Sequence, residues 1–137
     1  MKLYIIRHAE TEYNRKGIIQ GSEVDSDIND IGDSQSKSFY DYYQNVNFDK
    51  IYTSDLKRTF QTVKRFTENG TEYEKLKEFN EISWGVNQGK SDDLEDYSKL
   101  IDTWLAGDLD NKFEKGESPN EMSLRLVKGF NKVLEDN

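Results

Sequence analysis

The stretch LYIIRHAET, residues 3–11, contains an apolar run that ends abruptly at Arg7-His8. A short, uninterrupted apolar run is typical of a strand that is buried on both faces, as in a parallel sheet. Ligand sites of open α/β sheets lie at the carboxyl ends of such strands. We therefore expect a buried strand over residues 3–6 that places His8 at a functional site.

After this strand, the pattern predicts a polar loop over residues 9–29 and then a helix. Asn29 or Asp30 can cap that helix, because their side-chain oxygens accept hydrogen bonds from the free amides of a first turn. The helix is expected to run to about Asn45. Its apolar face would consist of Ile31, Phe39 and Tyr43.

A second strand is expected over residues 49–53, followed by a helix that Thr53 or Ser54 caps. This helix would end at Asn69-Gly70, since both residues tolerate left-handed backbone. Four apolar side chains recur at helical spacing and would form its buried face: Leu56, Phe60, Val63 and Phe66.

The remaining chain is predicted to contain a strand over residues 75–79, a loop over residues 83–92 and a helix from Leu94 to Leu105. The last helix has the clearest start, because Ser118-Pro119-Asn120-Glu121 combines a hydroxyl cap, a proline at the first helical position and a capping-box glutamate. The alternation of strands and helices predicts an α/β fold, mainly a parallel sheet flanked by helices, in a single domain over residues 1–137.

The composition narrows the function classes. The chain has 137 residues, 27 acidic against 19 basic, for a net charge of -8, which argues against nucleic acid as a partner. It has no cysteine and a single histidine, so disulfides and Cys- or His-rich metal sites are not expected. The sequence shows no signal peptide or membrane span, so we expect a cytoplasmic protein that does not contact a membrane.

His8 is the candidate nucleophile, because an imidazole at the end of a strand can attack phosphorus and carry the phosphoryl group covalently. The attacking nitrogen must be unprotonated, and neighbouring cations favour that form. The other ring nitrogen needs an acceptor, for which a backbone carbonyl would serve. The competing interpretation is a partly buried polar side chain without a chemical role.

Two further groups lie just after predicted strands. Arg58, in the segment Ser54–Arg58, could bind two phosphate oxygens at a helix start, and the alternative is a surface arginine. Glu81 could protonate a leaving oxygen, and the alternative is a surface glutamate. In the loop after His8, Asn14 and the pair Gln20-Gly21 could donate to phosphate oxygens or stabilise turns.

Taken in order, these segments resemble the signatures of the histidine phosphatase superfamily, which includes the phosphoglycerate mutases. The matching segments are Arg7-His8-Ala9-Glu10-Thr11 with Asn14 and Gln20-Gly21, Ser54-Asp55-Leu56-Lys57-Arg58, Glu81 with Gly85 and Gly89, and Gly116-Glu117-Ser118. The resemblance implies a phosphoglycerate-mutase-like fold and no metal or organic cofactor.

The same resemblance implies the role of each residue. His8 would form a phosphohistidine, and Arg7 and Arg58 would clamp the phosphoryl oxygens. Glu81 would act as a general acid and then as a general base. Asn14, Gln20 and Gly21 would line the phosphate pocket.

The chain departs from the family pattern at three points. Ala9 replaces a more usual glycine, and Gln88 stands where phosphatases of the family often have glutamate. The family also has a second pocket histidine, in a His-Gly pair after a strand that follows the late helix, whereas His8 is the only histidine here. We therefore expect a domain shortened at its C-terminal end, with an uncovered sheet edge through which a homodimer could form.

The favoured function is hydrolysis of a small phosphomonoester by way of a phosphohistidine. One alternative is phosphoryl transfer of the mutase type, although no arginine lies between Glu81 and Arg125, where mutases have an arginine-rich segment. The other is a non-catalytic phosphate-binding module or inactive fragment. The sequence does not identify the substrate, which the loops over residues 10–28 and 84–117 would select.

Overall fold

The structure is a computed structural model that describes residues 1–136. Its centre is a β-α-β unit, in which β1 (Lys50–Thr53) leads through α3 (Lys57–Glu68) to β2 (Glu72–Lys75). The two strands pair in parallel, with Lys50 opposite Glu72 and Thr53 opposite Lys75. This is the predicted α/β fold with a parallel sheet flanked by helices.

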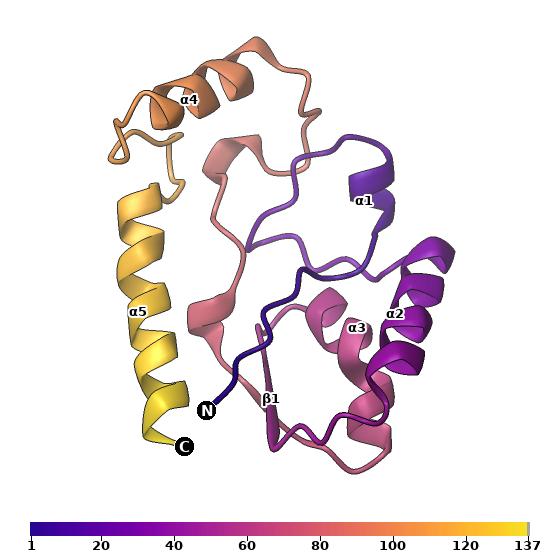
Figure 1. The fold of residues 1–137 in the computed structure, drawn as a ribbon. Helices are drawn as coiled ribbons and strands as arrows, with labels where there is room; N and C mark the ends of the chain where they lie inside the picture. Colours follow the sequence, from indigo (N-terminus) through magenta and orange to yellow (C-terminus); the bar gives the residue numbers. More distant parts are fainter. Residues whose placement is uncertain (137) are drawn as a thin grey trace.

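The longer helices lie on either side of this unit (Figure 1). On one side α2 (Asp30–Tyr43) packs on α3, and on the other α5 (Pro119–Glu135) packs on the 3-10 helix η1 (Lys77–Phe79). The end of α5 also joins β1, because Asp136 accepts hydrogen bonds from the Tyr52 hydroxyl at 2.9 Å and the Lys50 Nζ at 3.2 Å. The α5 side is therefore anchored directly to the sheet, whereas α2 packs on the helix that connects its two strands.

The predicted buried strand over residues 3–6 is wrong. The segment has no regular secondary structure, and Ile5 is 78% exposed. Tyr4 packs on one side, with its ring edge-on to Tyr43 and Phe48 at 5.8 and 5.2 Å, but 39% of it remains exposed. An apolar run favours a strand only where another strand offers backbone partners, and within residues 1–136 β1 pairs with β2 alone.

The helix predicted from Asn29 is confirmed as α2, whose first turn is capped by Asn29 through a 2.8 Å hydrogen bond from the Gly32 amide. The prediction that Ile31 packs inward is wrong, since 51% of it is exposed. Gly32 is buried instead, so close to the Glu10 carbonyl that a Cβ atom would come within 2.2 Å of the oxygen. This close approach decides which face of α2 is buried.

The helix after β1 is confirmed, but its predicted cap is wrong. α3 begins at Lys57, and its N-cap residue Leu56 makes no side-chain cap hydrogen bond. The Ser54 hydroxyl instead stabilises the preceding turn, accepting from the Leu56 amide at 3.2 Å and bonding the Thr59 hydroxyl at 2.9 Å. The predicted end is confirmed, because Asn69 is the C-cap residue and Gly70 has a φ of 96°.

The apolar face of α3 forms the core of this side of the molecule. Of the four predicted residues, Leu56, Val63 and Phe66 are buried, whereas Phe60 is only half-buried. Phe66 contacts the rings of Phe39 and Phe48 at 5.4 and 5.5 Å, which joins α2 to α3.

The third strand was predicted over residues 75–79, and the structure places β2 earlier, at Glu72–Lys75. The Leu76 amide makes the last hydrogen bond to β1, at 2.8 Å from the Thr53 oxygen, and the chain then turns into η1. Leu76 becomes buried in this turn, and the Phe79 ring packs on Phe130 of α5 at 5.2 Å. Packing against α5 therefore replaces strand pairing here.

The predicted loops contain short helices, α1 (Glu12–Arg15) and the 3-10 helix η2 (Gly85–Asn87). The helix expected from Leu94 is confirmed as α4 (Glu95–Leu105). The capping box of α5 is also confirmed, because the Ser118 hydroxyl accepts from the Glu121 amide at 3.2 Å and the Glu121 carboxylate accepts from the Ser118 amide at 2.9 Å. Among the described residues, no helix has the length and apolarity that crossing a bilayer requires.

Candidate active site

His8 opens onto a cavity of about 340 Å³. Four other residues that the sequence singled out share its wall: Arg7, Asn14, Gln20 and Glu81. They come from the N-terminal segment, the region of α1 and the segment after η1, so the fold collects them from distant parts of the chain. Gly21 and Arg58, which were also predicted, are outside this lining but adjoin it through the contacts described below.

The segment that carries His8 is anchored on α3. The Ala9 amide donates a 2.8 Å hydrogen bond to the Thr62 hydroxyl, which donates in turn to the Arg58 carbonyl at 2.7 Å. Ala9 is buried, so its methyl group fits where the family pattern more often has glycine. One hydroxyl of α3 therefore sets the position of the backbone next to the imidazole.

The His8 ring has a defined orientation. Its Nδ1 lies 2.7 Å from the Ala9 carbonyl oxygen, which can only accept a hydrogen bond, so Nδ1 carries the proton and Nε2 keeps its lone pair. Burial lowers the pKa of His8, and the charges of Arg58 and Arg7 lower it further, against the opposing effects of the Ala9 carbonyl and Glu81. Near neutral pH the imidazole is therefore uncharged.

Arg58 is fully buried beside this site. Its guanidinium donates to the carbonyl oxygens of Val24 and Gly21, at 2.6 and 3.4 Å, and its Nε has no hydrogen-bond partner within residues 1–136. These carbonyls hold the guanidinium in place without neutralising it, because they carry no net charge. Its charge is close enough to act on both His8 and Glu81.

Thr11 orients the two amide side chains of the cavity. Its buried hydroxyl lies 2.9 Å from the Asn14 Oδ1 and 3.1 Å from the Gln20 Oε1, and its backbone amide donates to the same Asn14 oxygen at 3.1 Å. The Ser26 hydroxyl donates to the Gln20 oxygen as well. Since the oxygens are occupied, the NH₂ groups of Asn14 and Gln20 remain as the donors available to a bound anion.

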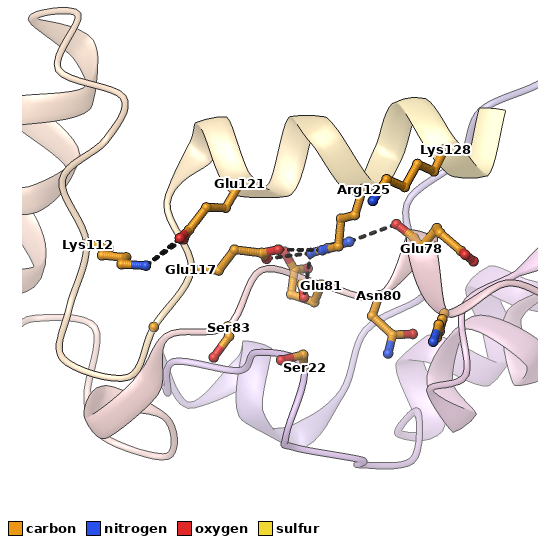
Figure 2. A pocket seen from close by; sticks show the side chains of 12 residues that line it. Ser22, Glu78, Asn80, Glu81, Ser83, Lys112, Glu117, Glu121, Arg125 and Lys128 are labelled. Atoms are coloured by element: carbon orange, nitrogen blue, oxygen red, sulfur yellow. Dashed lines mark hydrogen bonds and ion pairs between the residues drawn. The ribbon is translucent and has the colours of Figure 1, made fainter. Parts of the chain in front are cut away.

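Glu81 lies between two cavities of the molecule. It lines the His8 cavity and also a neighbouring groove of about 610 Å³ between α5 and the segment after η1, which Figure 2 shows. One carboxylate oxygen accepts from the Ile82 amide at 3.2 Å. A half-buried carboxyl group next to the cavity is suited to exchange a proton with a ligand there.

The family model for the histidine phosphatase superfamily (branch 1) matches residues 3–137. The chain belongs to this superfamily. It is 33% identical over 133 residues to phosphoserine phosphatase 1 of Hydrogenobacter thermophilus, covering 95% of this chain and 62% of that protein. Over 75 residues, which are 55% of this chain and 27% of the relative, it is 36% identical to the fructose-2,6-bisphosphatase TIGAR of Xenopus tropicalis.

Solved structures share the fold. YhfR of Bacillus stearothermophilus matches with a TM-score of 0.80 at 20% identity, covering 96% of this chain and 66% of that one. A phosphoglycerate mutase from Thermus thermophilus matches with a TM-score of 0.72 at 22% identity, covering 91% of this chain and 68% of that one. The chain spans 52–66% of the length of the curated relatives that match nearly all of it.

Several features of this site were not predicted from the sequence. Trp84 and Tyr97 line the cavity as an aromatic wall, with their ring centroids 5.1 Å apart, and Asp92 lies at the same cavity. Burial, together with the charges of Asp92 and Glu81, raises the pKa of Tyr97, so its hydroxyl stays protonated. These residues lie within the segment expected to select the substrate, but no local pattern marked them individually.

Gln88, a departure from the phosphatase pattern, has a structural role. Its Oε1 accepts a 3.0 Å hydrogen bond from the Glu23 amide. Gly21 lies directly against it, because a Cβ atom at Gly21 would come within 2.5 Å of that oxygen. Gln88 therefore holds the loop whose carbonyls bind Arg58.

The described residues show no metal centre. Among the described residues, no group of three or more His, Cys, Asp or Glu side chains is placed to hold a metal ion. The expectation that no cofactor takes part stays a prediction from the resemblance.

Proposed function

We propose that this protein hydrolyses a small phosphomonoester in two steps, through a phosphohistidine on His8. The observation that carries the proposal is the 2.7 Å contact between His8 Nδ1 and the Ala9 carbonyl, which leaves Nε2 as the nucleophilic nitrogen at a cavity with Arg7 and next to Arg58. A neutral imidazole beside two cations is suited to attack an anionic phosphorus centre.

In the first step, His8 Nε2 attacks phosphorus and the bond to the leaving oxygen breaks. Arg7 and Arg58 stabilise the charge on the phosphoryl oxygens, and the NH₂ groups of Asn14 and Gln20 donate hydrogen bonds to them. Glu81, as the protonated acid, gives its proton to the leaving oxygen, so that an alcohol departs.

In the second step, water attacks the phosphohistidine and the bond between Nε2 and phosphorus breaks. The Glu81 carboxylate accepts the proton of the water, which restores the acid for the next cycle. Inorganic phosphate leaves, and His8 returns to the neutral form that its surroundings favour. Glu81 therefore acts once as an acid and once as a base.

The substrate class follows from the cavity. A space of about 340 Å³ accommodates a small phosphorylated metabolite, and Trp84 and Tyr97 offer flat surfaces to its organic part. The similarity to a phosphoserine phosphatase over 95% of the chain supports a small phosphomonoester. O-Phosphoserine and 4-nitrophenyl phosphate are therefore suitable first substrates.

The test is to trap the intermediate. We expect rapid quenching with labelled substrate to give an acid-labile, base-stable phosphoryl group on His8, located by mass spectrometry. Because His8 is the only histidine, the site of labelling is unambiguous.

Variants of His8 and Glu81 distinguish catalysis through a phosphohistidine from binding of phosphate alone. His8→Ala should lose both label and turnover, whereas Glu81→Gln should still label with an activated aryl phosphate and lose turnover by about 10²–10⁴-fold. Turnover without label would reject the phosphohistidine, and binding of phosphate without turnover by the parent protein would reject the hydrolase.

A further inference from the structure

Arg125 of α5 binds the backbone of the segment that carries Glu81. Its NH1 group donates to the Glu78 carbonyl at 2.8 Å, and its NH2 group donates to the Glu81 carbonyl at 3.2 Å (Figure 2). The residues are 47 and 44 positions apart, so the contact joins the late helix to the edge of the cavity. No local sequence pattern indicates a role for this arginine.

Glu117 holds the guanidinium in a fixed orientation. Its two carboxylate oxygens lie 2.6 Å from Arg125 Nε and 2.7 Å from NH2, a paired geometry, and the two side chains are only 18% and 22% exposed. The Glu117 amide donates in turn to the Ser83 carbonyl at 2.8 Å. The segment from Glu81 to Ser83 is therefore held at one end by Arg125 of α5 and at the other by Glu117, which precedes α5, and the ion pair joins these two residues.

We propose that Arg125 is a positioning residue for Glu81, and that Glu117 orients it for this task. The inference rests on the proposed function, in which Glu81 must bring its carboxyl group within hydrogen-bond reach of the leaving oxygen. The only hydrogen bond that the structure gives the Glu81 carboxylate within residues 1–136 is the local one from the Ile82 amide. The position of the backbone therefore governs where the acid lies.

The other contacts of the segment over residues 78–81 hold Glu78 and Asn80 and not Glu81. The Asn80 side chain accepts from the Asp55 amide at 2.9 Å, and Lys132 pairs with the Glu78 carboxylate at 2.6 Å. Neither reaches the Glu81 carbonyl. Loss of Arg125 should therefore leave the segment attached but displace the acid.

Leaving groups of different basicity test the proposal. An alkoxide leaving group needs the proton of Glu81, whereas 2,4-dinitrophenolate departs without it. We expect Arg125→Met to lower kcat/KM for an alkyl phosphomonoester such as O-phosphoserine by about 10-fold or more, a part of the general-acid contribution. For 2,4-dinitrophenyl phosphate we expect little change.

The controls exclude a general loss of structure. Lys128→Met removes another cation that lines the same groove and that makes no contact with Glu81 or Glu117 among the hydrogen bonds and ion pairs of the described residues, so the hydrolysis of both substrates should be unaffected. Glu117→Gln keeps the arginine but weakens its orientation, and should give a smaller loss with the same selectivity. Arg125→Lys should not restore the activity, because an ammonium group cannot form the paired contact.

The outcomes are distinct. Equal losses on both substrates in Arg125→Met and Glu117→Gln would show a structural role only and overturn the proposal, while hydrolysis through His8 would stand. If Arg125→Met does not fold, Glu117→Gln decides by the same comparison. In a further outcome, the parent protein forms the phosphohistidine on His8 while Glu81→Gln lowers kcat/KM equally for both substrates. In that case Glu81 is not the general acid, and the roles assigned to Glu81 and to Arg125 both fail.

Discussion

At the scale of single residues, the imidazole of His8 is controlled by its surroundings. Nδ1 faces the Ala9 carbonyl at 2.7 Å, and burial with the charges of Arg58 and Arg7 lowers the pKa. The arrangement stabilises the uncharged ring and one tautomer, the two properties that a phosphate-accepting nitrogen needs.

The first prediction concerns this pKa. Because the chain has one histidine, the imidazole signals in an NMR titration all belong to His8. We expect the midpoint of this titration to lie below the ordinary value of 6.5. Arg7→Gln, at an exposed position, should raise the midpoint because it removes one of the lowering charges. A midpoint at or above 6.5 in the parent protein would contradict the description of the site.

The same shift affects stability in a definite direction. The unfolded chain takes up the proton near pH 6.5, whereas the folded state resists it, so protonation favours unfolding. The free energy of unfolding should decrease as pH falls below about 6.5 and be unaffected by His8 above it. Urea unfolding of the parent protein and of His8→Gln, measured above and below this pH, would isolate the contribution of His8 to the free energy of unfolding.

At the scale of elements, helix boundaries follow local chemistry, while the buried faces and strand ends follow packing. Asn29 caps α2 as expected, yet Gly32 and not Ile31 turns inward, because the Glu10 backbone lies against the helix. β2 ends at Lys75 because the chain then packs Phe79 against α5.

The second prediction concerns the start of α5. Ser118 is 2% exposed and caps the helix, so Ser118→Ala should lower the free energy of unfolding by about 1 kcal/mol. Ser123→Ala, at an exposed position in the same helix, is the control and should change stability by less than about 0.5 kcal/mol. Equal effects in urea unfolding would show that the cap contributes nothing specific.

At the scale of the whole molecule, apolar side chains remain on the surface. Residues 3–6 form no strand, and Leu3 and Ile5 are 50% and 78% exposed. β1 has a strand partner on one edge only, within residues 1–136. Such surfaces and edges favour association.

The third prediction concerns association. The sequence predicts a homodimer through an uncovered sheet edge, and the exposed residues 3–6, which form no strand, offer a different surface for it. We propose that the purified chain associates with a second copy through residues 3–6, so its sedimentation coefficient should rise with concentration. Ile5→Asp should suppress the rise, while Leu105→Asp, at an equally exposed position on α4, should not. A single monomer at every concentration, or equal effects of the two variants, would reject this interface.

The features that depend on neighbours along the chain could be predicted from the sequence. Each helix cap or helix end requires only groups within a few positions of the chain, so a local sequence pattern predicts it. This holds for the capping box at Ser118, the Asn29 cap and the helix end at Gly70. The ordered resemblance around His8, Arg58 and Glu81 identified the family, which the family model over residues 3–137 confirms.

The contacts between distant segments could not be predicted from the sequence, because they form only when the chain is folded. The Thr62 hydroxyl on the Ala9 amide, the guanidinium of Arg125 on the Glu81 carbonyl and the aromatic wall of Trp84 and Tyr97 join groups with no local pattern. The absence of a strand at residues 3–6 has the same origin. A strand requires backbone partners from elsewhere in the fold, whereas a helix cap is complete within its own turn.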